Sequence, residues 1–463
     1  MSTNLRCVSP VDGSIYVERD YATSNEIATA VETAVSAQMQ WKQTPVSERA
    51  EICTKAIDAF VAKQDEIGEG ITWQMGRPIR FGGGEVAGVE ERARHMISIA
   101  QTALSDIPVE EKDGFTRFIR HDPLGLIFVI APWNYPYLTS VNSIIPAIMA
   151  GNAVILKHSA QTPLCAEVYA EVFEAAGLPK GIFQYLHLNH ADTETLIQAP
   201  EVDFVAFTGS VPGGAMVERA AAGRFVGVGL ELGGKDPAYV RGDADVQYAA
   251  EGLVDGSFFN SGQSCCGIER IYVHENVYDQ FIDIARDTTL GYKLGNPTDP
   301  DVTIGPLVRA SAADFVRKQT ADAIAAGAQP LIPEGTFGAD EPGSPYLGPQ
   351  ILVNVDHSMD VMSEESFGPV VGIMKVASDE DAVKLMNDSA FGLTASIWTS
   401  DADAALRIGD SVSTGTWFMN RCDYLDPALA WTGVKDSGRG CTLSALGYDH
   451  LTRPKSFHLK TQL

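Results

Sequence analysis

The chain has 463 residues, of which 45% are hydrophobic and 20% charged, the composition of a soluble globular protein. One hydrophobic core rarely organises so long a chain, so we expect two or three domains. The formal net charge of -26 would repel nucleic acid phosphates and anionic lipid headgroups, so we expect no nucleic acid and no membrane partner.

The cysteines and the first residues indicate a cellular setting. Seven cysteines without regular spacing, and a start "MSTNLRCVSP" with neither a basic nor an apolar stretch, predict a cytoplasmic protein with reduced thiols. The apolar runs are too short, or too interrupted by Pro, Gly and Asn, to span the roughly 30 Å of a membrane interior. The histidines and cysteines lack metal-ligand spacing, so we expect no metal site.

The hydrophobic pattern predicts an α/β fold. Residues 24–104 space their apolar side chains three and four apart, as amphipathic helices do. From residue 125, short apolar runs alternate with longer helical segments, which is typical of a buried parallel sheet. The predicted strands are 125–133, 153–157, 181–186, 202–209 and 225–234. The predicted helices between them are 137–150, 162–177 with Thr162 as N-cap, and one that begins near Pro212.

After residue 265 a second α/β region is expected. Strands such as 270–275 and 370–376 alternate there with helices such as 277–292. The Gly- and Pro-rich segment 333–349 predicts a surface excursion within this region.

Two adjacent cysteines, Cys265 and Cys266, stand in "FFNSGQSCCGIER" behind small and polar residues. Small residues let backbone amides approach a reacting group, and a thiol attacks only as thiolate, which needs electropositive surroundings. On this segment alone, a buried structural cysteine is an equally good alternative.

Two polar side chains follow predicted strands. Asn134 in "APWNYP" comes after one strand, at the edge where parallel α/β sheets bind their ligands, and could donate to an oxyanion. Glu231 in "ELGGKDP" ends another strand, and the two glycines after it leave space for a water that the carboxylate could activate.

Six segments together resemble the aldehyde dehydrogenase superfamily in order and approximate spacing across essentially the whole chain. They are "APWNYP", "FTGS", "ELGGKDP", "NSGQSC", "EESFGPV" and "GVKDSGRG". The resemblance implies a variant Rossmann cofactor domain, a second α/β catalytic domain and a small β bridging element for oligomerisation. The implied ranges are 1–108 and 124–230 for the cofactor domain, 231–440 for the catalytic domain, and 109–123 and 441–463 for the bridging element. The bridging segments alternate as edge strands do, and edges are normally covered, so we expect a homodimer or a homotetramer.

The resemblance also implies catalytic roles. Cys265, two positions after Gln263, would be the nucleophile, and Asn134 with the Cys265 amide would stabilise the oxyanion. Glu231 would activate the water that hydrolyses the thioester. The implied reaction is the oxidation of an aldehyde, with semialdehydes among the candidates, to the carboxylic acid with NAD or NADP.

The cofactor residues follow from the same resemblance. Lys157 and Ser159 would contact the adenosine ribose, Gly209 and Ser210 would lie beneath the diphosphate, and Glu365 would hold the nicotinamide ribose. The residues expected to border the ring and its path are Phe367, Trp133 and Ile130. Taken singly, Lys157 would be read as a solvated strand end and Phe367 as a core aromatic.

The family pattern places a substrate pocket around the nucleophile. The expected lining is Tyr137, Leu138, Thr139, Asn142, Phe259, Ser264, Cys266 and Arg421. Arg421 or Tyr424 could meet a carboxylate on the aldehyde, although an exposed structural cation is as good an interpretation of Arg421. The stretch "LKHSAQTPLCAE" is similar to succinate-semialdehyde-type members.

The chain departs from the family pattern in three places. Ala160 in "KHSA" replaces a ribose-binding Glu, and without that carboxylate to repel a 2′-phosphate NADP becomes admissible while NAD stays open. The stretch "FQYLHLNHADTETL" lacks the Gly-rich loop of many members, so the residues of the adenine pocket are not assigned from the sequence. Cys441 and Thr442 replace a common Arg-Glu pair, so Glu231 is expected to act with water alone.

Three alternatives remain. A CoA-acylating relative would exclude water, and the presence of Glu231 argues against it. A silent structural or binding protein on the same scaffold would not need Cys265, Asn134, Glu231 and Glu365 together. A cysteine hydrolase would need a partner histidine, and no histidine lies in a recognisable motif.

Overall fold

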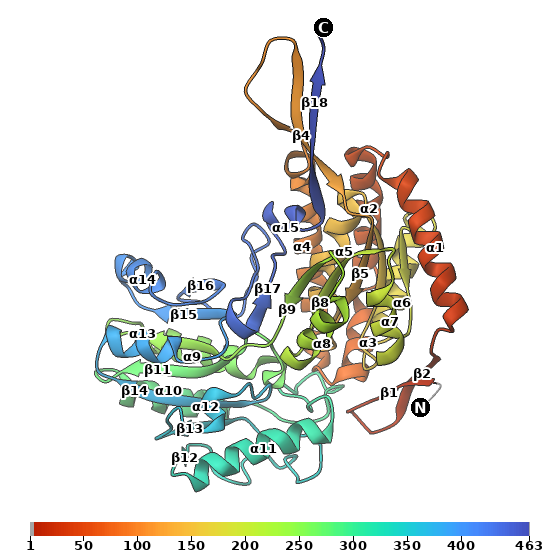
Figure 1. Ribbon diagram of the computed structural model, residues 1–463. Coiled ribbons are helices and arrows are strands. Elements are labelled where there is room, and N and C mark those ends of the chain that lie inside the picture. Colours follow the sequence, from red (N-terminus) through yellow and green to blue (C-terminus); the bar gives the residue numbers. More distant parts are fainter. Residues whose placement is uncertain (1–3, 463) are drawn as a thin grey trace.

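The computed structural model describes residues 4–462, so the ends of the predicted ranges at 1–3 and 463 lie outside the described residues. A six-stranded sheet in the order β17-β9-β8-β5-β6-β7 stands beside a seven-stranded one, and helices flank both (Figure 1). The prediction of an α/β fold is confirmed. The strands of the first sheet are β5 (Leu126–Ile130), β6 (Ala153–Lys157), β7 (Phe183–Tyr185), β8 (Val202–Thr208), β9 (Gly227–Glu231) and the short antiparallel β17 (Gly438–Arg439).

The strand register of this sheet brings polar residues to one edge. Ile130 pairs with both Lys157 and Phe207, and Thr208 pairs with Glu231, so the carboxyl ends of four parallel strands lie side by side. Parallel α/β sheets bind ligands outside this edge.

Helices cover both faces of the first sheet because its central strands are apolar on both sides. Ile127 and Val129 of β5 face one helical layer, whereas Leu126 and Phe128 face the other. The first layer holds α2 (Val46–Val61), α3 (Gln64–Met75), α4 (Gly82–Ala103), α5 (Pro136–Ala150) and α6 (Leu164–Ala175). The second holds α1 (Ser24–Trp41), α7 (His190–Gln198) and α8 (Val211–Ala221).

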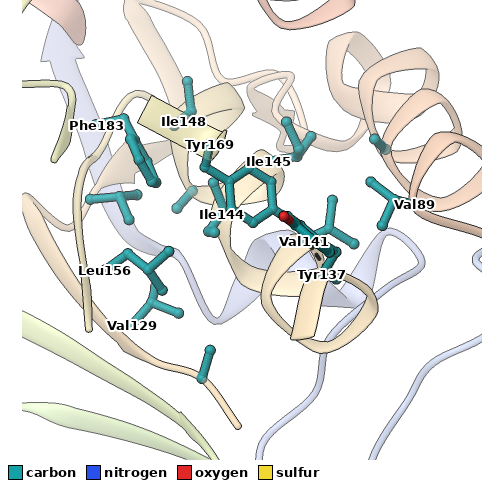
Figure 2. Packing of buried hydrophobic residues seen from close by; sticks show 14 of the residues in the cluster. Val89, Val129, Tyr137, Val141, Ile144, Ile145, Ile148, Leu156, Tyr169 and Phe183 are labelled. Carbon is teal, nitrogen blue, oxygen red and sulfur yellow. Dashed lines mark hydrogen bonds between the residues drawn. The ribbon is translucent and has the colours of Figure 1, made fainter. Parts of the chain in front are cut away.

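Helix α5 lies at the centre of the first layer and is buried on nearly all sides (Figure 2). Ile144 and Ile148 lie among side chains from β5, β6 and α6. The helix ends at Gly151 with a φ of 95°, the left-handed conformation that glycine adopts without strain. Its near-complete burial makes it a rigid support for whatever its first turn contacts.

One predicted helix boundary was wrong. Thr162 does not cap α6, which begins at Leu164 after Pro163, because the Thr162 hydroxyl lies 3.0 Å from Nδ1 of His158. The strand predicted to run to residue 133 ends at Ile130, and a loop follows it.

The second sheet has the order β12-β13-β14-β11-β10-β15-β16 and is parallel except for β12. Its strands are β10 (Asp236–Val240), β11 (Ile268–His274), β12 (Gln329–Pro330), β13 (Gln350–Val353), β14 (Val370–Val376), β15 (Thr394–Trp398) and β16 (Thr416–Met419). Its helices are α9 (Val246–Phe258), α10 (Tyr278–Leu290), α11 (Ala310–Ala325), α12 (Asp360–Ser363), α13 (Asp379–Asn387) and α14 (Ala402–Gly409). Residues 333–349 form neither helix nor strand, as expected for a surface excursion.

A three-stranded sheet extends beyond the main body (Figure 1). It consists of β3 (Ile107–Pro108), β4 (Phe115–Pro123) and β18 (Thr452–Lys460), with β18 paired antiparallel to β4 along its whole length. The two segments expected to bridge thus pair with each other, while the domain boundaries stay a prediction. The remaining elements are β1 (Asn4–Val8), β2 (Ile15–Asp20), α15 (Leu446–Asp449) and the 3-10 turns η1 (Ile79–Phe81), η2 (Phe259–Gly262) and η3 (Lys435–Ser437).

None of the helices within residues 4–462 is long and apolar enough to cross a membrane.

Replacing the fully buried Ile144 by alanine should lower the free energy of unfolding by about 2–5 kcal/mol, because a cavity would remain in the core around α5. Thermal and denaturant unfolding of Ile144→Ala would measure the loss. The matched control is Leu406→Ala, whose side chain is 69% exposed and should change the free energy by less than about 0.5 kcal/mol. Equal losses in the two variants would contradict this picture of the core.

Candidate active site

A cavity of about 440 Å³ lies between α4, the start of α5, the loop that carries Cys265, and the end of β9. The structure brings to it most of the residues that the sequence predicts for the reaction and for substrate binding. They are Glu231, Leu138, Thr139, Asn142, Phe259, Ser264, Cys265 and Cys266.

A tight turn between α9 and the cavity sets the position of Cys265. Asn260 and Ser261 have φ values of 54° and 57°, and Gly262 follows with 71°. A Cβ on Gly262 would collide with the carbonyl of Gly368, so only glycine fits at that point. The Gln263 side chain then accepts a hydrogen bond from the Val308 amide at 2.8 Å. This bond fixes the turn to the segment of the same chain that precedes α11.

The two glycines after Glu231 allow two close approaches. A Cβ on Gly234 would collide with the carbonyl of Cys265, and a Cβ on Gly233 would collide with the carboxylate of Glu365. The loop that carries Cys265 and the side chain of Glu365 therefore both lie against the backbone that follows β9.

Asn134 lies beside the Cys265 loop rather than in the cavity wall. Its side-chain amide donates to the carbonyl of Gln263 at 3.3 Å, and its side chain is buried. Its own carbonyl accepts from Arg77 at 2.6 Å and from Asn260 at 3.2 Å. The residue is thus held from both sides.

Two threonine hydroxyls hold the carboxylate of Glu231. Thr442 donates to Oε1 at 2.6 Å and Thr208 donates to Oε2 at 3.2 Å. Burial raises the pKa of Glu231, while these two hydrogen bonds oppose the rise because they favour the charged form. Thr442, which stands where the family pattern has a common Glu, thus contacts Glu231 directly, and the expectation that Glu231 acts with water alone stays a prediction.

The charged wall contributed by α4 was not predicted. Arg77, which follows α3, forms a fully buried ion pair with Glu85. Glu85 also accepts hydrogen bonds from the amides of Tyr137 and Leu138, at 2.7 and 3.2 Å, and so caps the first turn of α5. Arg92 lies about two helical turns after Glu85, on the same face of α4, and is buried in the cavity wall.

Two predicted pocket residues were wrong. Tyr137 does not line the cavity but lies in the core beside Tyr169 (Figure 2). Its ring centroid lies 5.1 Å from that of Phe60. Arg421 is exposed, with its guanidinium 3.7 Å above the ring of Tyr424, and it does not line the cavity. Tyr424 does line it, and its hydroxyl donates to Glu91 at 2.6 Å.

A second crevice, of about 570 Å³, joins the N-terminus of α8 to Glu365. Ser210 caps α8 and lines the crevice, so the anion-favouring end of a helix faces it. Gln319 of α11 also lines it, and both polar atoms of its buried amide lack a hydrogen-bond partner within the described chain. Unpaired buried polar atoms are rare in proteins, so these residues fit a polar ligand such as a dinucleotide.

The other predicted cofactor residues lie around the same sheet edge. Ring centroids of Trp133 and Phe367 are 5.7 Å apart in an edge-on contact. Burial lowers the pKa of Lys157, at the end of β6 beside Ile130, to about 8. Gly209 follows β8 directly, and Ser159 accepts from the Gln161 amide at 3.2 Å.

Glu365 is perturbed by its surroundings. Burial, and then the nearby charge of Glu269, raise its pKa to about 8, and the amide of Gly234 donates to it at 3.0 Å. A carboxyl group that is buried beside a crevice in this way is typical of a binding site.

Comparisons with known proteins agree with this geometry. Residues 1–457 match the model of the aldehyde dehydrogenase family. The chain is 34% identical over 444 residues to succinate-semialdehyde dehydrogenase (NADP+) 1 of Mycobacterium tuberculosis, covering 95% of this chain and 96% of that relative.

Two solved structures share the fold. Succinic semialdehyde dehydrogenase from Streptococcus pyogenes, in complex with NADP+, matches with a TM-score of 0.93 at 27% identity, covering 98% of this chain and 100% of the other. An NAD-dependent aldehyde dehydrogenase from Sinorhizobium meliloti matches with a TM-score of 0.94 at 29% identity, covering 99% and 91%.

The match to the family spans nearly the whole chain, in sequence and in fold. It does not favour a CoA-acylating enzyme or a silent scaffold protein. The chain belongs to the aldehyde dehydrogenase family and is an NAD(P)-dependent enzyme that oxidises an aldehyde to the carboxylic acid.

Proposed function

We propose that this enzyme oxidises a semialdehyde with NADP, and that Cys265, Asn134 and Glu231 carry out the reaction. One observation carries the assignment of roles. Cys265 and Glu231 line the same cavity, and Asn134 is hydrogen-bonded to the loop that holds Cys265.

The first step is addition of the Cys265 sulfur to the aldehyde carbon. The carbonyl oxygen becomes an oxyanion, to which the Asn134 side-chain amide and the Cys265 backbone amide donate. Loss of one such donor typically lowers the rate by about 100- to 1,000-fold. A bound NAD(P) supplies the acceptor for the hydride that leaves the carbon attached to sulfur.

The second step is hydrolysis of the thioester on Cys265. Glu231 takes a proton from the attacking water, and the acid leaves as the Cys265 thiolate is released. Glu231 must be ionised for this, and the hydroxyls of Thr442 and Thr208 favour that state in a buried setting.

The names of similar proteins support the substrate and the cofactor. The relative from Mycobacterium tuberculosis carries succinate semialdehyde and NADP+ in its name, and the structure from Streptococcus pyogenes holds NADP+. The exposed Ala160 beside Lys157 and Ser159 presents no carboxylate to a 2′-phosphate, which also supports NADP.

The assembly and the compartment are proposed on separate grounds. The β4–β18 arm extends from the body and leaves most of β18 exposed, which supports a homodimer or homotetramer in which a second copy covers this edge (Figure 1). All seven cysteines are free, which supports a reducing compartment such as the cytoplasm.

The variant Cys265→Ser should lose aldehyde-dependent reduction of NADP, because a hydroxyl is a far weaker nucleophile than a thiolate. The matched control Cys266→Ser should keep most of the activity. The measurement is absorbance of the reduced nicotinamide, with NADP binding followed separately and expected to be unchanged. Full activity of Cys265→Ser would overturn the assignment of the nucleophile.

Replacing Thr442 by valine should move the acidic limb of the pH–rate profile upward by about one to two pH units. The pKa of Glu231 rises when a hydrogen bond to its charged form is lost, and such a bond is worth about 1.5–3 kcal/mol. Because the ionised form is the active one, a higher pKa removes activity at the acid side. Thr208→Val, whose bond is longer, should shift the limb less. An unmoved limb in Thr442→Val would contradict this role.

The variant Ala160→Glu should raise the KM for NADP about tenfold or more relative to the KM for NAD, because a repulsion of 1.4 kcal/mol already amounts to a factor of ten. Ala160→Gln controls for size without charge and should leave the ratio nearly unchanged. Steady-state kinetics with both cofactors measure the ratio. Equal effects on both KM values would show that position 160 does not face the 2′ group.

A further inference from the structure

We infer that Arg92 binds the far carboxylate of the semialdehyde and thereby determines the substrate class, an inference that rests on the function proposed above. No other position of α4 offers a cation to the cavity of Cys265.

Arg92 is only 9% exposed, although the exposed part faces the cavity. One terminal nitrogen, Nη1, donates to the carbonyl of Leu138 at 2.7 Å and to the side chain of Asn142 at 3.3 Å. Nε and Nη2 make no hydrogen bond within residues 4–462 and are not completely enclosed. One nitrogen thus anchors the guanidinium to α5, while the other two are open to a molecule in the cavity.

No carboxylate in the described part of the chain forms an ion pair with Arg92. Glu85, about two helical turns earlier on α4, forms an ion pair with Arg77 and accepts a hydrogen bond from the Tyr137 amide in the first turn of α5. Glu91 accepts from the hydroxyl of Tyr424. Glu231 is held by the hydroxyls of Thr442 and Thr208.

A buried cation without a partner is costly, because the cavity removes much of its hydration. A substrate carboxylate would supply the missing counter-charge, and the planar guanidinium can meet both carboxylate oxygens in a forked arrangement. An aldehyde with a neutral far end would leave the guanidinium without a counter-charge, so the free-energy cost of burying it would remain. Arg92 therefore favours an aldehyde that ends in a carboxylate over its uncharged counterpart.

Asp423 is a carboxylate in the same cavity and would instead favour a substrate with a positively charged far end. It lines the same cavity, where one carboxylate oxygen accepts from the Cys266 thiol at 2.9 Å and from Ser264 at 3.4 Å. Burial raises its pKa, which favours its neutral form. Asp423 thus has two donors to its oxygen, whereas Arg92 forms no ion pair and keeps two nitrogens without a hydrogen bond within residues 4–462, although its charge acts on Asp423 and Glu231 and opposes the rise in their pKa.

The experiment compares succinate semialdehyde with butanal, which has the same number of carbons and no charge. In wild type, succinate semialdehyde should have the higher kcat/KM. Arg92→Met should lower kcat/KM for succinate semialdehyde by about 100-fold, chiefly through KM, as is typical when one partner of a buried charge pair is removed. Its kcat/KM for butanal should stay within about threefold. Arg92→Lys should recover part of the loss, because lysine keeps the charge without the fork.

Equal losses on both substrates in Arg92→Met would show a purely structural role and overturn the inference. A wild-type preference for an aldehyde with a far ammonium group, lost in Asp423→Asn, would overturn it in favour of Asp423. Wild type that oxidises butanal well without preferring succinate semialdehyde would overturn this inference alone. Wild type that oxidises neither aldehyde would overturn the proposed function itself.

A measurement on wild type covers the case in which the Arg92 variants fail to fold. Succinamate and butanamide should be compared as inhibitors against butanal as the substrate, because both end in the same amide and only succinamate has a far carboxylate. Succinamate should inhibit at least about tenfold more strongly, since a difference of 1.4 kcal/mol in binding gives that factor. Equal inhibition by the two amides would overturn the inference.

Discussion

The active site depends on the buried ion pair between Arg77 and Glu85. Removing two charges from water is expensive, and such a pair persists only where its remaining hydrogen-bonding capacity is used. Glu85 accepts hydrogen bonds from the first amides of α5, beginning with that of Tyr137. Arg77 donates hydrogen bonds to the carbonyl of Asn134 and to the side chain of Asn260. The pair thus joins α4, α5, the strand-end loop of Asn134 and the turn before Cys265. Loss of either partner would leave an unpaired charge at the junction of all four segments.

Much of the fold could be predicted from the sequence because its signals are local, and the residues expected to react were placed by the family resemblance. The strand 153–157 is a continuous apolar run between turn residues, and it occupies the same residues in the structure. Asn134 follows β5 and Glu231 ends β9, and parallel strands end at one edge, so their placement at the same edge of the sheet follows from the pattern. The close approaches at Gly233 and Gly234 likewise follow from a residue that lacks a side chain.

The substrate wall could not be predicted as well, because it depends on helix orientation. Successive residues of a helix point about 100° apart, so Tyr137 cannot face the same space as Leu138, Thr139 and Asn142 together. On α4, Arg92 shares a face with buried apolar residues, and a charge within an apolar stripe was the available signal for a site. The partners of Arg92 come from α5, far along the chain, and only tertiary packing brings them together. Arg421 stacks on its own neighbour, a contact that no spacing rule predicts.

The backbone of Gly233 and Gly234 is also the link by which the chain leaves the first sheet after β9 and enters the second at β10. Glu231 stands at the start of this link, and the Cys265 loop and Glu365 rest against it. A change in the angle between the two sheets would therefore move Glu231 relative to both Cys265 and Glu365, which lie on segments of the second sheet's unit. A rigid-body motion cannot alter the distance from Glu231 to Cys265 without altering the distance from Glu231 to Glu365. Under the roles proposed above, this couples hydrolysis to the hold on the nucleotide.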